Sequence, residues 1–385
     1  MTTPHDLEGL TKARPVELAR VRDVAGRSRM TKNQLVEALL ASPAAPGPAT
    51  PPTPQERRHA LSERLAALVD TDRRCTWRDR EGNPCGLPPI TGQAVCALHG
   101  GIDVFDAAVP VTGRLCFDTW PTLGRHLAMA EYDVDPIGLD PLIAEMVWHL
   151  ANFLYFDYFK VEVDGIENVP VEGPGLIVGN HGGAALPYDA LMLTTAVANE
   201  ALTPRRLRVI GTEIFNMLPW LSHLYRKSGA AYASRGDVAH LLRNRRLVGV
   251  FPEGERGFMK PVWEAYRIQR FGRGGFLELA EAYSAPVIPV AIVGSEEVHP
   301  AVGVSGTLAK LVRLVWPEQR VDEMAVVLNP IPLPVRWRIR FLPPLEPAGG
   351  DAAADPLWVL ERTETIRRSI QDQLDDILRV RRTSF

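Results

Sequence analysis

The sequence has no apolar run long enough to cross a bilayer without charged residues in it. Its longest one, Leu142 to Phe159, contains Glu145, His149 and Asp157, and such side chains are costly inside a membrane. The first residues also lack the apolar core of a secretory signal. We therefore expect a cytoplasmic protein that contacts membranes peripherally.

Cysteine and net charge are also scarce. The 385 residues include only four cysteines, and the formal net charge is -3. Without a basic excess, bulk nucleic-acid binding is not favoured. Three of the cysteines cluster near one histidine, which indicates metal ligation rather than a disulfide framework. The length suffices for a large catalytic domain with smaller modules.

Strand and helix patterns alternate through the second half of the chain. The expected strands are Phe159–Val163, Leu176–Gly179, Leu207–Ile210, Leu247–Phe251, Val287–Val293 and Trp337–Phe341. The expected helices are Pro187–Val197, Gly236–Arg243, Gly275–Tyr283 and Pro356–Val380. This alternation predicts an α/β fold with a mostly parallel sheet flanked by helices on both faces.

A His and an Asp lie on either side of a turn rich in small residues. His181 follows an apolar run, and Pro187 suits the first turn of the next helix, which places Asp189 at its N-terminus. A carboxylate bonded to one imidazole nitrogen leaves the other free to accept a proton. No Ser or Cys has the context of a nucleophile, so an acceptor hydroxyl would attack. The pattern indicates acyl transfer; a loop His near a capping Asp is the alternative.

Three further blocks carry residues suited to substrate binding. The block Gly229–Arg235 ends in an Arg whose planar fork of donors suits phosphate. The block Phe251–Gly257 offers Glu253 to a polar head group and Arg256 to an anion. The block Val287–Ala291 is an apolar strand able to wall an acyl pocket.

These four blocks, in this order and spacing, resemble the glycerolipid acyltransferase family, which contains lysophosphatidic acid and glycerol-3-phosphate acyltransferases. The similarity extends from about Asp133 to the C-terminus. It includes the run Tyr266–Gly275, typical of a bacterial branch related to diacylglycerol acyltransferases. The resemblance implies that His181 is the general base and that Asp189 orients it. It also implies acceptor binding by Arg235, Glu253, Gly254 and Arg256.

Two features depart from the commonest family pattern. Seven residues separate His181 from Asp189, more than in most members, so the turn between them is longer. Glu255 places a negative charge beside Arg256, which would weaken a phosphate preference and favour a neutral acceptor. The acyl donor would be acyl-CoA or an acyl carrier protein. Residues expected near the donor phosphates are Lys260, Arg267, Arg270 and Arg273, and a solvated basic face is the alternative.

Two interpretations remain open for Leu142–Phe159. Its mixture of aromatic and aliphatic residues suits a helix lying in a membrane interface. A helix packed on the sheet explains the same pattern.

A compact, turn-rich segment carries the clustered cysteines. Cys75, Cys85, Cys96 and His99 supply four ligands within 25 residues, and zinc favours a tetrahedral Cys₃His set. The segment resembles small bacterial zinc-knuckle-like modules. We expect a structural zinc, whose filled coordination leaves no place for catalysis; incidental reduced thiols are the alternative.

The N-terminal region reads as a small helical unit with Thr31 as a helix N-cap. It is similar to the N-terminal domain of transcription terminator Rho and to SAP-like modules, which implies a nucleic-acid or protein partner. The expected organisation is a helical module (1–42), a Pro/Ala-rich linker (43–54), a helix (55–72), the zinc module (73–101), a connector (102–132) and the acyltransferase domain (133–385).

The leading hypothesis is therefore an O-acyltransferase that moves a fatty acyl group from a thioester to a glycerolipid such as a lysophospholipid. A nonenzymatic nucleic-acid or protein adaptor on a degenerate scaffold is one alternative. A thioester hydrolase is the other.

Overall fold

The computed structural model divides the chain into two units, Met1–Thr53 and Pro54–Phe385. It describes residues 31, 34, 52–78, 82, 84–111, 134–211, 224–272, 274–315, 322–350 and 352–383. In the first unit Thr31 and Gln34 exchange backbone-to-side-chain hydrogen bonds, as in a capping box, which confirms Thr31 as an N-cap. The rest of the predicted helical module and nearly all of the linker lie outside the described residues.

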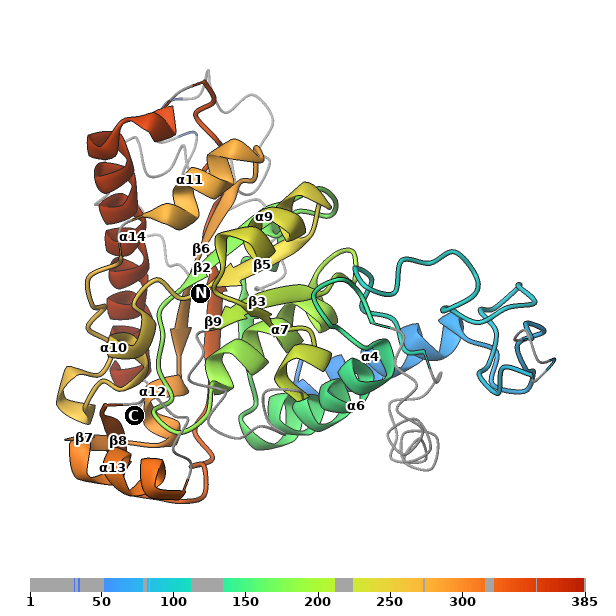
Figure 1. The fold of residues 1–385 in the computed structure, drawn as a ribbon, viewed down its shortest axis with the longest axis horizontal. Coiled ribbons are helices and arrows are strands. Elements are labelled where there is room, and N and C mark those ends of the chain that lie inside the picture. Colours follow the sequence, from blue (N-terminus) through green and yellow to red (C-terminus); the bar gives the residue numbers. More distant parts are fainter. Residues whose placement is uncertain are drawn as a thin grey trace. The chain divides into compact units, whose positions relative to one another are not determined.

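A seven-stranded sheet forms the centre of the second unit (Figure 1). Its strands are β1 (Glu162–Asp164), β2 (Gly175–Gly179), β3 (Leu207–Gly211), β4 (Ala231–Tyr232), β5 (Leu247–Val250), β6 (Val287–Val293) and β9 (Arg338–Phe341). Their order is β1-β9-β6-β2-β5-β3-β4. Only the β6–β9 pair is antiparallel among these described strands. The prediction of a mostly parallel sheet is thus confirmed, although the two-residue strand β4 was too short to predict.

Both faces of the sheet are covered by helices, as predicted. Along β2, Leu176 and Val178 join one core and Ile177 joins the other, because successive side chains of a strand point to opposite faces. Helices on the Ile177 face are α4 (Pro54–Leu68), α6 (Pro141–Asn152) and α7 (Tyr188–Glu200). Helices on the other face are α9 (Arg235–Arg243), α11 (Gly275–Ala282) and α14 (Pro356–Thr383). The short helical turns are η4 (Ile166–Asn168), α10 (Gly254–Phe258), η6 (Val262–Glu264), α12 (Ser295–Val298) and η7 (Ala352–Ala354).

The predicted helix Leu142–Phe159 is divided into two parts. Asp140 caps α6 by accepting from the backbone N–H groups of its first turn, and the chain continues as the π-helical turn η3 (Phe153–Tyr158). Trp148 is buried against the sheet, whereas Leu150 and Phe153 are exposed. The segment therefore packs on the sheet through one face. Within the described residues, the helices are all too short or too polar to span a membrane.

The segment before α6 is part of the same unit. Arg57 of α4 pairs with Glu200 of α7, and Arg64 donates to the carbonyl of Asn199. Ala107 forms an isolated antiparallel bridge with Arg205, next to the start of β3. These contacts fasten α4 and residues 102–111 to the sheet.

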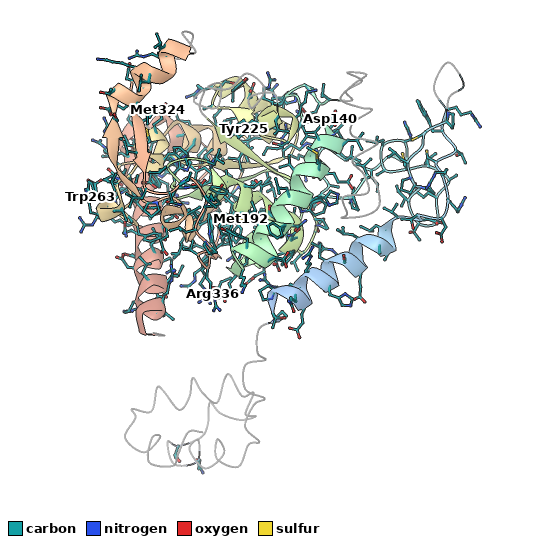
Figure 2. All side chains as sticks on the ribbon, turned by 90° about the horizontal axis from the view of Figure 1, so that it is seen from below. Asp140, Met192, Tyr225, Trp263, Met324 and Arg336 are labelled. Atoms are coloured by element: carbon teal, nitrogen blue, oxygen red, sulfur yellow. The ribbon has the colours of Figure 1, made fainter. Side chains whose placement is uncertain are left out.

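A two-stranded ribbon and a helix lie at one end of the unit. The ribbon is formed by β7 (Ala301–Ser305) and β8 (Met324–Val327), and α13 (Gly306–Val315) follows β7. None of these elements was predicted. In the view from below, α13 stands at the edge of the unit, next to the ribbon that carries Met324 (Figure 2).

Candidate active site

His181 and Asp189 form a direct pair at the carboxyl end of β2. His181 Nδ1 lies 2.6 Å from Asp189 Oδ2, and the same carboxylate accepts from the backbone N–H of Gly182 at 2.9 Å and of Ala190 at 2.7 Å. Asp189 is fully buried, in the first turn of α7. Three donors therefore fix the carboxylate, and the longer turn does not separate it from the imidazole.

The turn between them needs glycine at one position. Gly183 has a φ of 135°, and a Cβ there would lie 2.6 Å from the carbonyl oxygen of Leu186. A larger residue would force the turn open. Gly183 thus allows the chain to fold back and return Asp189 to His181.

Two phenylalanine rings hold the imidazole. The His181 ring stacks on Phe251 with centroids 4.6 Å apart, and Phe258 lies 5.1 Å away. The imidazole is 14% exposed and lines a small hollow of 40 Å³. Because Asp189 occupies Nδ1, Nε2 is the nitrogen left to accept a proton.

Glu253 holds the backbone of His181 rather than facing solvent. Its Oε1 accepts the His181 N–H at 2.8 Å, and its Oε2 accepts the Gln269 N–H at 2.7 Å. Its side chain is fully buried. This placement differs from the predicted contact with an acceptor head group, because the carboxylate already accepts hydrogen bonds from two backbone N–H groups of the protein.

Lys260 also lies inside the protein. Its ammonium is 3.2 Å from Glu253 and 2.9 Å from Glu296. Burial lowers the pKa of Lys260, but attraction to the two carboxylates outweighs it and the pKa is raised. Burial raises the pKa of Glu296 to about 7, although Lys260 opposes the shift. The predicted role of Lys260 as a phosphate ligand does not fit this position, since the ammonium neutralises buried carboxylates.

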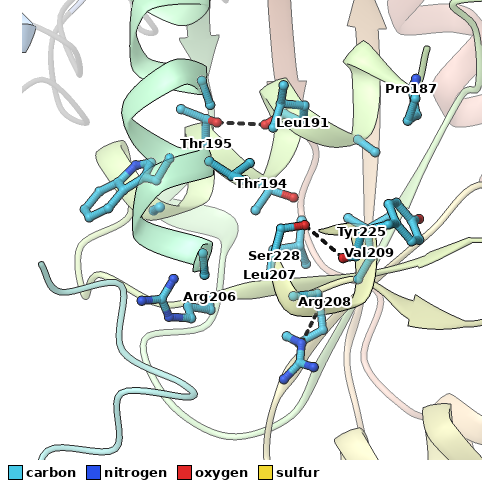
Figure 3. A pocket seen from close by; sticks show the side chains of 18 of the residues that line it. Pro187, Leu191, Thr194, Thr195, Arg206, Leu207, Arg208, Val209, Tyr225 and Ser228 are labelled. Carbon is cyan, nitrogen blue, oxygen red and sulfur yellow. Dashed lines mark hydrogen bonds between the residues drawn. The ribbon is translucent and has the colours of Figure 1, made fainter. Parts of the chain in front are cut away.

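An apolar cavity of 320 Å³ adjoins the histidine hollow. Its walls come from α6, α7 and β3, and Pro187, Ala190, Val209 and Tyr225 line both spaces. In the close view, the guanidinium groups of Arg208 in β3 and of Arg206, just before β3, extend away from α7 (Figure 3). The cavity wall is therefore mostly apolar and suits an acyl chain.

The block Val287–Ala291 does not supply that wall. It belongs to β6, every residue of which is buried within the sheet. Its apolar run reflects a strand covered on both faces, and the prediction of an acyl-pocket wall at β6 is wrong for the cavity beside His181.

A polar hollow of 850 Å³ lies next to the small hollow at the histidine. Arg256 and Arg270 line it, and both are exposed. Glu255 lines this hollow and the small one at His181, so the two are adjacent. Arg235 stands at its edge, where it pairs with Glu278 at 2.8 Å. The remaining predicted donor ligands are Arg267, which is exposed, and Arg273, which lies outside the described residues.

Gly254 is the hinge between β5 and α10. Its φ is 59°, and a Cβ there would meet no atom within 4 Å. The left-handed backbone favours glycine, and the open space beside it belongs to the histidine hollow.

Sequence reasoning missed two residues of the site. Tyr225 lines both the cavity and the histidine hollow, and burial raises its pKa. Asn180 joins β2 to β6 by donating to Ile292 O at 3.0 Å and accepting from Ile292 N at 2.7 Å. Its position just before His181 was the available signal for Asn180. Tyr225 had none, because it follows a segment without a clear pattern.

The predicted zinc ligands come together in one place. The ligand atoms of Cys75, Cys85, Cys96 and His99 all lie within 4.8 Å of one another. Cys85 and Cys96 Sγ are 3.8 Å apart, and His99 Nδ1 is 3.6 Å from Cys75 Sγ. Thiolates bound to a tetrahedral zinc at about 2.3 Å would be separated by about 3.8 Å. The donor set and its spacing fit zinc.

The electrostatics of the cluster favour a bound cation. Burial and the neighbouring Cys85 and Cys75 raise the pKa of Cys96 to about 12. A metal ion would offset this repulsion by binding the thiolate forms. Trp77 stacks on His99 with centroids 3.9 Å apart and fixes the plane of the ligand ring.

Comparisons with known proteins agree with a transferase site of this kind. A family model described as Acyltransferase matches residues 160–293, which include the His–Asp pair and the Glu253 block. An uncharacterized protein of Mycobacterium tuberculosis (strain H37Rv) is 38% identical over 265 residues, covering 68% of this chain and 74% of the relative. A Mycobacterium leprae protein, also uncharacterized, is 37% identical, with 68% and 72% covered. The chain belongs to the acyltransferase family, in a group that includes these mycobacterial proteins.

Two more distant proteins are also similar. A bovine protein named DGAT1/2-independent enzyme synthesizing storage lipids is 30% identical over 129 residues, 34% of this chain and 37% of the relative. The crystal structure of the 1-acyl-sn-glycerophosphate acyltransferase PlsC from Thermotoga maritima aligns with a TM-score of 0.43 and 17% identity, covering 68% of this chain and 89% of that one.

Proposed function

We propose that this protein is an O-acyltransferase that moves a fatty acyl group from acyl-CoA to the hydroxyl of a glycerolipid. The observation that carries the proposal is the position of the His181–Asp189 pair. It lies between an apolar cavity that suits an acyl chain and an arginine-lined hollow that suits phosphate.

His181 acts as the general base in this proposal. Nε2 takes the proton of the acceptor hydroxyl while that oxygen attacks the thioester carbonyl carbon. The C–S bond then breaks, and the thiolate leaves with the proton that the imidazolium returns. Asp189 holds the imidazole and stabilises its positive charge while the proton resides there.

The two larger spaces bind opposite ends of the substrates. The acyl chain lies in the cavity between α6, α7 and β3. Arg235 and Arg256 bind the acceptor head group, and Arg270 with Arg267 binds the donor phosphates, because guanidinium groups match phosphate oxygens. Gly254 leaves room beside His181 for the reacting groups.

The acceptor class includes neutral glycerolipids. Glu255 lines the passage between His181 and the polar hollow, and its charge disfavours a phosphate close to the base. The bovine relative is named for synthesising storage lipids, which supports an acceptor panel that contains diacylglycerol as well as lysophospholipids.

The direct test is product analysis by mass spectrometry with labelled acyl-CoA and that acceptor panel. The wild type should form an acylated lipid, and His181→Ala should lower its rate on the order of 10²–10⁴-fold. The control is His59→Ala, which replaces an exposed histidine of α4 and should leave the rate unchanged. Free fatty acid formed without an acceptor would indicate a thioester hydrolase. Absence of any turnover would favour an adaptor.

We further propose that Cys75, Cys85, Cys96 and His99 hold one structural zinc. The support is the separation of their ligand atoms. The four ligands complete a tetrahedral set, so the metal would stabilise this segment without contacting substrate. Elemental analysis of the purified protein should give one zinc per chain, and a clearly lower content would contradict the site.

A further inference from the structure

Apolar side chains gather on the outer side of α13 and of the β7–β8 ribbon. Leu311 is 56% exposed and Leu314 80% exposed, and Leu308 lies beside them on the helix. The opposite side of α13 carries Ala309, which is fully buried. The exposed apolar residues of the ribbon are Val302, Val304 and Val326, and the exposed Leu328 directly follows β8. Monomeric proteins seldom expose this many apolar groups together.

This apolar surface continues along the chain after β8. Ile331 is 70% exposed, and Leu333 is also exposed. Between them, the carbonyl of Pro332 accepts a hydrogen bond of 2.6 Å from Tyr158 Oη. The Tyr158 ring in turn contacts Phe153, with centroids 6.4 Å apart. The loop after β8 therefore lies against η3, which directly follows α6.

At the end away from α13, these exposed residues reach the rim of the apolar cavity beside His181. Leu150 precedes Phe153 by one helical turn, is exposed, and lines the cavity. Leu186 is also exposed and lines the same cavity. We name the exposed apolar residues from Leu150 and Phe153 through Ile331 and Leu333 to the ribbon and α13 the apolar belt. In Figure 1, α6 and α13 both lie on the lower side of the unit.

We propose that the apolar belt docks on the surface of a lipid bilayer, an inference that rests on the proposed function for the use of the cavity. A bilayer covers exposed leucines and also supplies acyl chains at the cavity rim, which a protein partner does not. An amphipathic helix beside cationic groups is the usual form of such a contact. Here Lys310 and Arg313 lie on α13 and Arg336 follows the loop.

Acidic groups limit the electrostatic part of this contact. Arg313 pairs with Asp322 at 3.5 Å, and Glu323 is exposed beside it. Positive and negative charges thus nearly balance around α13. Docking is therefore driven by apolar insertion, and it should persist at high salt, where contacts with anionic head groups are screened.

The experiment is cosedimentation of the full chain with vesicles of phosphatidylcholine containing phosphatidylglycerol. The double variant Leu311→Glu with Leu314→Glu should lower the partition coefficient by at least about tenfold, because two carboxylates replace inserting leucines. The matched control is Leu357→Glu, a leucine 61% exposed at the start of α14, which should bind vesicles like the wild type. Circular dichroism and thermal unfolding show that each variant is folded.

Two outcomes overturn the proposal. One is unchanged vesicle binding by the folded double variant. The other is a wild-type dimer in sedimentation velocity that is lost in the double variant, since a second copy would then cover the belt.

A water-soluble short-chain thioester and acceptor separate this proposal from the catalytic one. The double variant should turn over these soluble substrates like the wild type. If the wild type itself fails to turn them over, the proposed function is contradicted, and the vesicle experiment still tests the belt.

Discussion

Asp189 is the most constrained residue of the site. It is fully buried, yet all its bonding capacity is directed to His181 and to two backbone N–H groups of its own turn. A buried carboxylate with this many donors is held in one orientation. Its role is therefore to position the imidazole, and its loss should affect catalysis more than binding.

Replacement of Asp189 by Asn tests this role. The amide keeps the shape of the side chain but offers a donor as well as an acceptor, so His181 can adopt the wrong tautomer. We expect kcat to fall on the order of 10²–10⁴-fold with little change in KM. Steady-state kinetics across a range of acceptor concentrations measure both. A variant with wild-type kcat would contradict the pair as the catalytic base.

Glu296 makes a pH-dependent contribution to stability. Its pKa in the folded protein is about 7 because of burial, against an ordinary value of 4.5. Between these values the folded state binds more protons than the unfolded state, so the unfolding free energy falls as pH rises. Glu296 and Glu253 both pair with the single ammonium of Lys260, so one negative charge of the group is not neutralised. A proton bound to Glu296 removes this excess charge.

The Glu296→Gln variant should therefore lose part of this pH dependence. We expect the wild type to lose stability between about pH 5 and pH 8 with a steeper slope than the variant. Urea unfolding at several pH values gives both slopes. Glu361→Gln, which changes an exposed glutamate of α14, should keep the wild-type slope, and equal slopes for wild type and Glu296→Gln would contradict the assignment.

At the scale of elements, the end of β2 is fastened to its neighbour by a side chain. Beyond the last residue of β2, the side chain of Asn180 continues the hydrogen bonding to β6 through its two bonds to the backbone of Ile292. His181 follows directly, so this bridge fixes where the proposed general base leaves the sheet.

Replacing Asn180 by Ala leaves a buried N–H and a buried C=O of β6 without partners. Each unsatisfied group costs about 1–3 kcal/mol, so we expect about 2–6 kcal/mol of lost stability. Urea denaturation measures the change. Asn244→Ala, at an exposed position after α9, should stay within about 0.5 kcal/mol of the wild type, and similar losses for the two variants would contradict a special role for the bridge.

The segment that carries the proposed zinc ligands should be stabilised by the bound metal rather than by an apolar core. Removing the metal with a chelator should unfold residues 70–101, because the buried thiols lose the cation that holds them together. Limited proteolysis should then cut within this range while the sheet stays intact. Cys96→Ser should behave like the chelated protein and Cys116→Ser, outside the ligand set, like the untreated one. Equal protection with and without chelator would contradict the site.

The sequence predicted most strands and helices of the sheet domain, but it did not predict where individual side chains lie. Apolar runs such as Val287–Val293 predict strands because both their faces are buried, but they do not tell a pocket wall from a sheet interior. Lys260 and Glu253 looked like ligands, since charge at a turn normally faces solvent. Only the fold brings Glu296 from a distant segment to neutralise Lys260. The sequence analysis did not predict the ribbon or α13, although the apolar residues of α13 recur at helical spacing.

At the scale of the whole molecule, the proposed reaction depends on the meeting of two dissimilar spaces at one imidazole. The sheet places His181 at the carboxyl end of β2, where α/β proteins collect their ligands. The apolar cavity and the arginine-lined hollow both adjoin the small hollow at His181. Changes in the two spaces should therefore have separable effects on the reaction.

Ala198→Leu tests this separation from the apolar side. Ala198 is a buried residue of α7 that lines the cavity, and a larger side chain there takes up volume that a long acyl chain would fill. We expect kcat/KM to fall about tenfold or more for long chains and little for short ones, since overpacking costs about 1–3 kcal/mol. Arg256→Ala should instead lower kcat/KM for all chain lengths alike, because Arg256 lines only the polar hollow among the described spaces. A uniform loss in Ala198→Leu would show that the acyl chain lies elsewhere.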